Sequence, residues 1–477
     1  MRAEYLKKNM PIILILAFII SIITIVFNWT WVACIIYGCV AIYFLIKNNE
    51  YTIIAFLTMA VFQNIILIIF ADNISPTYNT IISLIKEFLL YGATVVGIIL
   101  YGKQNGIKLL FKRYKWILVF ILLFIAIVFK NIIVSNAQTM SVLVALRQMG
   151  LPFACFFCGY FLTVKTDTMK KIIRYLVIIA SVLTVIGIAD MILPDNALWN
   201  ILDYGQYLQN KQDGIVSLYK GVTRNFYTWD LGFMMRRLVS ITGDPLATAH
   251  LVCIGFMAFI CFRYDFVKKH HFSKAYIVTF VLLLAGCILG FSKGTVVYIM
   301  ILAAALLYDR YYDKLNRTMI MAVIGLMLVI FTVFIVLSYV NADKPTAITN
   351  HINGLLSGLG NATLWGNGIG TSGAVNSAIT GAAIDSAESY FGVVLSQIGW
   401  YGIVIIASLW FRLLIKNFQG YLLYRSKEQL FSIILIIGLS IDMLLSESSV
   451  SITGTGIYFI IIGILYKRNS WKEIGYE

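Results

Sequence analysis

The sequence predicts an all-α, polytopic membrane protein that forms a single integral membrane domain over residues 1–477. Hydrophobic residues make up 60% of the chain and charged residues only 12%, whereas a soluble protein is about 25% charged and about half apolar. The mean hydropathy is +0.87, and only 6 prolines interrupt the apolar runs. These observations exclude a soluble enzyme, a disordered chain and a small secreted domain stapled by disulfides.

Apolar runs long enough to cross a bilayer, which takes about 20 residues, predict about fourteen (12–14) transmembrane helices. In the first half of the chain the expected spans are Pro11 to Phe27, Trp29 to Ile46, Tyr51 to Phe70, Ile81 to Tyr101, Trp116 to Val134, Val142 to Val164 and Ile172 to Leu193. In the second half they are Leu246 to Phe262, Ala275 to Phe291, Thr295 to Tyr308, Met319 to Val340, Glu388 to Phe411, Phe431 to Leu445 and Val450 to Tyr466.

The positions of the basic residues predict the orientation of these helices. With the N-terminus in the cytoplasm, twenty-seven of the 37 Lys and Arg residues fall in cytoplasmic segments, as the positive-inside rule requires. Both termini are then cytoplasmic. The net charge of +15 therefore reflects topology and an attraction to anionic membrane lipids, and no nucleic-acid partner is expected.

Two outer connections are long, at residues 194–243 and 341–387. Within the first, Ala197 to Leu208 carries apolar residues at helical spacing, which fits either an amphipathic helix lying in the membrane interface or a loop helix packed on the bundle. The second is rich in glycine, which allows close backbone approach or mobility.

Charged residues inside the predicted spans gather toward the outer helix ends. They are Lys86, Glu87, Arg147, Asp190, Asp442 and Glu447. A charge within the membrane costs at least about 2.5 kcal/mol on insertion scales and therefore suggests function. Snorkelling to the interface explains Lys86 and Glu447, but it explains Arg147 and Asp442 less well, because these lie about a turn or more inside their spans. The pattern predicts a polar cavity open to the outer face.

The stretch from Arg236 to Pro245 predicts an anion site. Asp244 is expected to cap a helix that starts at Pro245, since proline is favoured at the first helical position. The positive end of that helix would face outward beside Arg236 and Arg237, an arrangement that suits a phosphate group. Arg224 lies upstream on the same loop. Alternatively, these arginines pair with the loop carboxylates Asp203, Asp213 and Asp230.

Two further stretches stand out. One is a tight outer turn, Phe291-Ser292-Lys293-Gly294-Thr295. The other is a glycine-rich stretch, Trp365-Gly366-Asn367-Gly368-Ile369-Gly370, which is followed by Glu388-Ser389-Tyr390-Phe391 and then by Gln397-Ile398-Gly399. Glu388 fits a carboxylate facing the cavity, but it also has capping-box spacing to Asp385. Cys155 and Cys158 form a CxxC without a second pair, so we interpret them as packing residues. His250 is interpreted as a packed histidine, and no metal-ligand spacing, P-loop or dinucleotide fingerprint occurs.

Three motifs occur in order over residues 236–402. They are the arginine-rich loop ending in S-x-T-G-D-P, the S-K-x turn, and the G-x-G-x-G stretch before E-S-Y-F and Q-x-G. Together they resemble the O-antigen polymerase and ligase superfamily of the Wzy/WaaL type, which includes capsule and exopolysaccharide polymerases. The resemblance implies a C-type glycosyltransferase fold that handles saccharides on undecaprenyl diphosphate at the outer face of the bacterial plasma membrane. It implies neither a metal nor another cofactor. The ligase branch usually has histidine where this chain has Glu388, which favours a polymerase.

The sequence therefore predicts a polysaccharide polymerase that joins lipid-linked repeat units. Glu388 and Asp442 are the expected catalytic carboxylates, and the expected diphosphate ligands are Arg147, Arg224, Arg236, Arg237, Asp244 and Lys293. The expected partners are the lipid-linked oligosaccharide, membrane lipids, a flippase and a chain-length regulator. Two alternatives are a ligase that moves finished glycan to another acceptor and a lipid-linked oligosaccharide flippase or transporter. A transporter is expected to have midplane substrate groups and internal repeats, and neither is evident here.

Overall fold

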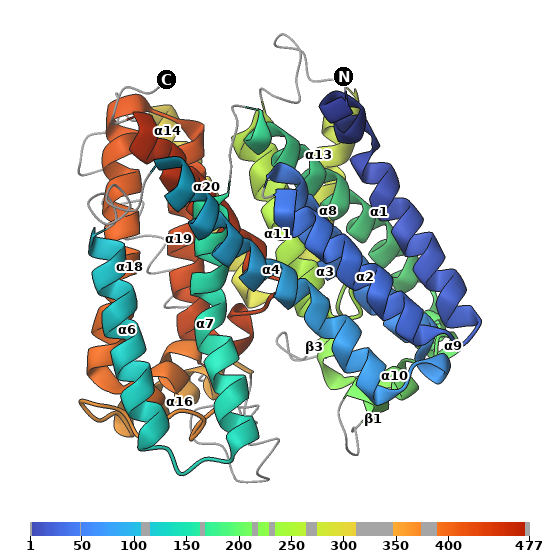
Figure 1. The fold of residues 1–477 in the computed structure, drawn as a ribbon, viewed down its shortest axis with the longest axis horizontal. Coiled ribbons are helices and arrows are strands. Elements are labelled where there is room, and N and C mark those ends of the chain that lie inside the picture. The colour runs from blue at the N-terminus through green and yellow to red at the C-terminus, as the bar shows by residue number, and fades with distance from the viewer. Residues whose placement is uncertain are drawn as a thin grey trace.

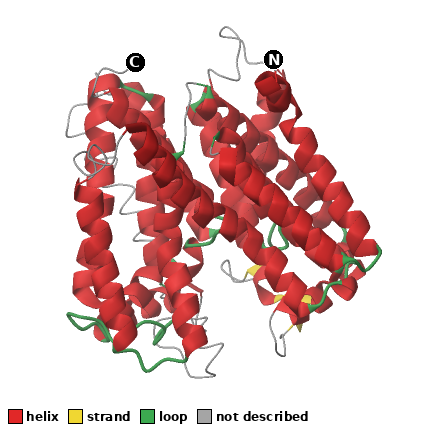
Figure 2. Cartoon of the chain, viewed as in Figure 1, coloured by secondary structure: helices red, strands yellow, loops and turns green. Residues whose placement is uncertain are grey.

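The computed structural model describes residues 2–47, 49–105, 115–162, 167–211, 218–228, 234–263, 274–311, 347–373 and 389–472. This part of the chain is a multi-pass α-helical membrane protein. It contains nine helices with the length and apolar composition to cross a membrane, and three shorter apolar helices accompany them. Helix dominates Figure 2, and the few strands lie together at one end of the molecule.

The long helices follow the predicted spans closely. They are α1 (Arg2–Val26), α2 (Thr30–Lys47), α3 (Glu50–Ile69), α4 (Pro76–Asn105), α6 (Lys115–Ile133), α7 (Thr139–Phe161), α8 (Thr168–Ile192), α11 (Pro245–Cys261), α13 (Lys274–Leu289), α14 (Lys293–Tyr311), α18 (Tyr390–Tyr424), α19 (Lys427–Leu445) and α20 (Gly456–Lys472). Thirteen predicted spans thus coincide with a helix. The remaining one, Met319 to Val340, lies outside the described residues.

Shorter elements lie in the connections between the long helices. They are η1 (Ala71–Asn73), η2 (Pro194–Asn196), α9 (Ala197–Ile201), α10 (Tyr204–Lys211), η3 (Arg224–Phe226), α16 (Ala347–Gly360) and η4 (Glu447–Ser449). Two antiparallel strand pairs join them: β1 (Leu218–Tyr219) with β2 (Val222–Thr223), and β3 (Tyr227–Thr228) with β4 (Met235–Arg236).

The helices form two groups that stand side by side (Figure 1). One contains α1, α2, α3, α8, α11 and α13, the other contains α6, α7, α18, α19 and α20, and α4 runs diagonally between them. Both termini lie at one end of the bundle, whereas α9, α10 and α16 lie at the opposite end. This agrees with the prediction that the two long connections share one side and the termini the other.

The closest helix crossing joins α7 to α20 through small residues. A Cβ atom on Gly159 would lie 2.0 Å from the Ile460 carbonyl oxygen, and one on Gly463 would lie 2.1 Å from the Phe156 carbonyl oxygen. Close backbone approach at small residues is the usual basis of helix association in membranes, where no hydrophobic driving force operates between helices. Cys155 is fully buried beside this crossing, in keeping with a packing role.

The stretch predicted as amphipathic divides into α9 and α10, with Asp203 between them at a φ of 48°. Trp199 and Tyr204 are buried and their rings pack with Phe226. The Asn210 side-chain amide donates to the Ala71 carbonyl at 2.7 Å. Of the two interpretations of this stretch, the helix packed on the bundle is therefore confirmed.

Two predicted helix starts are wrong. Helix α18 begins at Tyr390, and its cap is Ser389, whose hydroxyl accepts from the Gly392 amide at 3.1 Å. Asp385, the cap expected from the sequence, lies outside the described residues. Helix α20 begins at Gly456 instead of Val450, because Thr455 folds back and donates its hydroxyl to the Ser449 carbonyl at 2.6 Å. At α18 the Ser389 hydroxyl satisfies an N–H group that the helix start would leave open.

We expect Gly159→Ala to lower the thermal unfolding midpoint of the detergent-purified protein. The new methyl group must displace the Ile460 backbone, and overpacking of this kind costs about 1–3 kcal/mol. Gly38→Ala on α2 is the matched control, because nothing lies within 4 Å of its Cβ position. Equal midpoints for the two variants would show that the α7–α20 crossing is not the tight contact described here.

Candidate functional site

The turn that enters α11 is built by the residues of the S-x-T-G-D-P motif. Asp244 caps the helix, accepting from the Leu246 amide at 2.9 Å, and Pro245 is its first residue, which confirms the prediction. Gly243 has a φ of 62°, a conformation in which glycine is favoured. Thr242 accepts from the Asp244 amide at 3.3 Å and lies 2.6 Å from the Thr248 hydroxyl. The motif therefore has a structural role in setting this helix start.

Arg236 anchors the first long connection to the end of α8. One terminal nitrogen lies 2.8 Å from Asp190 Oδ2, and the other donates to the carbonyls of Asp190 and Leu193 at 3.1 and 3.0 Å. Trp199 Nε1 also donates to Asp190 Oδ2, at 3.1 Å. The Asp190 side chain is fully buried and that of Arg236 is 14% exposed. Among the described residues the partner of Arg236 is therefore Asp190. Of the loop carboxylates named as alternatives, Asp213 and Asp230 lie outside the described residues.

The other arginines of this connection differ in their surroundings. Arg224 is exposed at the start of η3. Arg237 is half-buried, and its backbone amide donates to the Phe226 carbonyl at 2.8 Å, which continues the β3–β4 pairing by one residue. Arg224 and Arg237 are thus held on one compact piece of the connection, next to the start of α11.

A set of cations, the outer cation cluster, lies between α3, α4, α7 and α10. It consists of Lys86, Arg147 and Lys211. Arg147 forms a two-pronged ion pair with Glu87, with Nε to Oε2 at 2.7 Å, and its side chain is still 49% exposed. Lys211 lies within electrostatic range of Lys86, Arg147 and Asp244. Three cations therefore face two carboxylates, which leaves positive charge available for an anionic ligand.

Two lysines of this cluster differ from what the sequence predicts: Lys86 is expected to snorkel, and Lys211 is not predicted as a site residue. Lys86 does not snorkel: it is only 6% exposed, and its Nζ donates to Gln63 Oε1 at 3.1 Å. Lys211 lies in the long connection, outside the spans, where a lone lysine attracts no attention. Tyr207, followed by Asp244, raises the pKa of Lys211, so it remains a cation at neutral pH.

A second polar group forms where α11, α14, α19 and α20 meet. The Asp442 carboxylate lies against the first turn of α14, since a Cβ atom on Gly294 would be 2.7 Å from Asp442 Oδ1. Lys293 is the first residue of α14, and its ammonium nitrogen is buried. His250 Nε2 lies 3.6 Å from Asp442 Oδ2. The structure thus brings the predicted carboxylate Asp442 close to the S-K-x turn.

The glycine-rich stretch is seated in a break of α18. Gly399 has a φ of 72° inside this helix, and the Thr363 carbonyl accepts from the Trp400 amide at 3.1 Å. The Gln397 side chain accepts from the Gly370 amide at 3.1 Å and donates to the Ser372 carbonyl at 2.7 Å. The G-x-G-x-G and Q-x-G motifs are therefore in direct contact through these hydrogen bonds.

Glu388 lies outside the described residues, and Ser389, which follows it in the chain, is described. The Ser389 hydroxyl donates to the Leu444 carbonyl at 2.8 Å, which joins the start of α18 to the end of α19, two residues beyond Asp442. Across the described ranges, no group of three His, Cys, Asp or Glu side chains could hold a metal ion.

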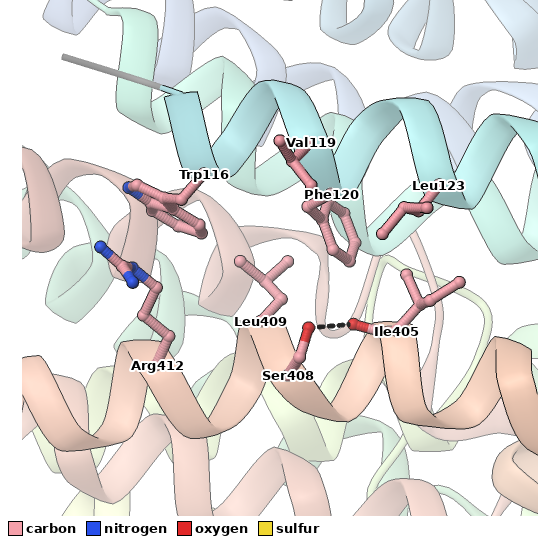
Figure 3. A pocket seen from close by; sticks show the side chains of 8 residues that line it. All are labelled: Trp116, Val119, Phe120, Leu123, Ile405, Ser408, Leu409 and Arg412. Carbon is pink, nitrogen blue, oxygen red and sulfur yellow. Dashed lines mark hydrogen bonds between the residues drawn. The ribbon is translucent and has the colours of Figure 1, made fainter. Parts of the chain in front are cut away.

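A groove between α6 and α18 is a different kind of surface (Figure 3). Its lining is mostly apolar, and Arg412 stacks on Trp116 with 4.4 Å from the guanidinium carbon to the ring centre. The Ser408 hydroxyl is already used, donating to the Ile405 carbonyl at 2.7 Å. This groove offers no carboxylate, so transfer chemistry is not expected in it.

Comparisons of this chain with protein-family models, curated proteins and solved structures find no match. The family resemblance therefore rests on the three motifs described above.

We expect Arg236→Ala to destabilise the protein strongly, because it leaves the Asp190 carboxylate buried without its cation. Breaking one side of a buried pair costs about 3–5 kcal/mol, so the unfolding midpoint should fall well below that of Arg224→Ala, which removes an exposed arginine from the same connection. The double variant Arg236→Ala/Asp190→Ala should recover part of the loss. A wild-type midpoint for Arg236→Ala would contradict the anchoring role.

Proposed function

We propose that this protein is a membrane polysaccharide polymerase that joins undecaprenyl-diphosphate-linked repeat units on the outer face of a bacterial plasma membrane. The observation that carries this proposal is the outer cation cluster, where Lys86, Arg147 and Lys211 outnumber Glu87 and Asp244. This cluster lies at the bundle end that carries the two long connections. A lipid diphosphate is an anion that approaches such a site from the membrane surface.

The reaction proposed here is the displacement of lipid diphosphate by a sugar hydroxyl. The hydroxyl oxygen forms a bond to the anomeric carbon of the donor, and the bond from that carbon to the diphosphate oxygen breaks. Arg147 and Lys211, with Arg224, Arg237 and Lys293, would stabilise the charge that develops on the departing diphosphate. A carboxylate, Glu388 or Asp442, would accept the hydroxyl proton. The lipid-linked donor supplies the driving force, and the proposal includes no metal or other cofactor.

The proposal also defines the expected partners. A flippase must deliver the lipid-linked repeat unit to the outer face, and a chain-length regulator would set when growth ends. The site therefore needs access from the lipid as well as from water, and the Arg147 side chain, which is 49% exposed, is the accessible part of the cluster.

Glycan chain length in a deletion strain tests the proposal. We expect lipid-linked single repeat units to accumulate, and long chains to return when the gene is restored. Long glycans that remain unattached would instead indicate a ligase, and repeat units retained inside the cell would indicate a flippase. Either result would overturn the polymerase assignment.

The same strain, complemented with Lys211→Gln, tests the cation cluster. A hydrogen bond to a charged group contributes about 1.5–3 kcal/mol, so its loss from the transition state should slow chain growth by roughly 10- to 150-fold. Lys274→Gln removes the same charge from an exposed position at the opposite end of the bundle and should leave growth unchanged. Equal rates for both variants would exclude Lys211 from the site.

A further inference from the structure

A buried polar cluster sits inside the helix ends that carry Asp442. It consists of His250 on α11, Tyr298 on α14, Asp442 on α19 and Tyr458 on α20, which are 3%, 0%, 4% and 0% exposed. The Tyr458 hydroxyl donates to the His250 backbone carbonyl at 2.7 Å. The rings of Tyr298 and Tyr458 pack at 5.2 Å, and each meets the His250 ring edge to face. Four helices therefore enclose one imidazole and one carboxylate.

Three polar atoms of this cluster have no hydrogen-bond partner. They are His250 Nδ1, the Tyr298 hydroxyl and Asp442 Oδ2. His250 Nε2 lies 3.6 Å from Asp442 Oδ2, slightly beyond hydrogen-bond length. A buried carboxylate without a partner is very unfavourable in a membrane protein, whereas a proton held between an acid and an imidazole removes that penalty.

The other carboxylate oxygen has a different environment. Asp442 Oδ1 faces the first turn of α14 at Gly294, where the positive end of the helix dipole stabilises negative charge. One oxygen thus lies where anionic charge is favoured, and the other lies beside a base that can carry a proton. This division of the carboxylate between two environments suits a group that takes up a proton and gives it back.

We infer that His250 and Asp442 hold one proton between them, and that this pair accepts the proton of the attacking sugar hydroxyl. The inference rests on the proposed function for its substrate. As the hydroxyl oxygen bonds to the anomeric carbon and the diphosphate leaves with the bonding electrons, the hydroxyl proton moves to the Asp442 carboxylate. The proton already shared then resides on the imidazole. His250 is a positioning residue, because it acts through Asp442.

Other titratable groups surround the pair on every packed element. They are Lys293 and Tyr298 from α14, Cys253 from α11, Cys287 from α13 and Tyr458 from α20. We assign the shared proton to the imidazole and the carboxylate because His250 Nε2 and Asp442 Oδ2 approach each other at 3.6 Å.

The pH dependence of chain growth by purified protein in lipid vesicles tests the positioning role. Growth should decline at low pH as the pair gains a second proton. In His250→Leu the carboxylate loses its neighbour and protonates more readily, so this decline should move upward by about 1–2 pH units. His250→Gln keeps an N–H near the Nε2 position and should recover part of the shift. An unchanged pH profile in His250→Leu would overturn the inference.

A measurement without catalysis separates this inference from the proposed function. The chain has only 4 histidines, so histidine-specific ¹⁵N labelling gives a short NMR spectrum in which His250→Gln identifies one residue. We expect the His250 titration to differ between the wild type and Asp442→Asn, while the other histidines stay unchanged. Identical His250 titrations would refute the shared proton. A deletion strain with normal chain lengths would instead refute the polymerase, whatever the NMR result.

Discussion

The energetic cost of an unpaired charge inside a bilayer determines how the helices meet at the end of the bundle that carries the two long connections. Each buried carboxylate there faces a group from another element: Glu87 on α4 faces Arg147 on α7, Asp190 on α8 faces Arg236 on β4, and Asp442 on α19 faces His250 on α11. Removing one partner of such a pair is far more costly than the pair is favourable. These contacts therefore specify which helices adjoin, and they concentrate the polar groups in one region.

Glycine residues in the backbone also determine how these helix ends are arranged. Gly243 allows the turn that presents the start of α11, and Gly399 opens α18 so that the glycine-rich stretch can enter it. Close crossing of α7 and α20 at Gly159 brings the start of α20, with Tyr458, against the buried histidine. The polar groups of this region are therefore held by helix ends, which gives them the fixed geometry that the proposed binding of an anionic substrate requires.

The sequence was sufficient for features that depend on local patterns. Apolar length predicted the spans, and Asp244-Pro245 predicted a helix start to the residue. Contacts between residues far apart in the chain could not be predicted from local patterns. Asp190 and Arg236 are 46 positions apart, and His250 and Asp442 are still further apart. The helix start near Glu388 differs from the prediction because the sequence offers several capping residues there and the helix uses Ser389. Lys211 was missed because its partners Tyr207 and Asp244 come together only in the folded chain.

The central claim is that these polar helix ends face the outside of the cell, and cysteine accessibility measures that directly. Single cysteines at exposed Asn225 and Thr371 mark the two long connections, and one at exposed Lys274 marks the opposite end, in a background lacking the native exposed Cys39 and half-exposed Cys34. An impermeant thiol reagent should label the first two in intact cells and the third only after permeabilisation. The reverse pattern would place the site in the cytoplasm and contradict the account.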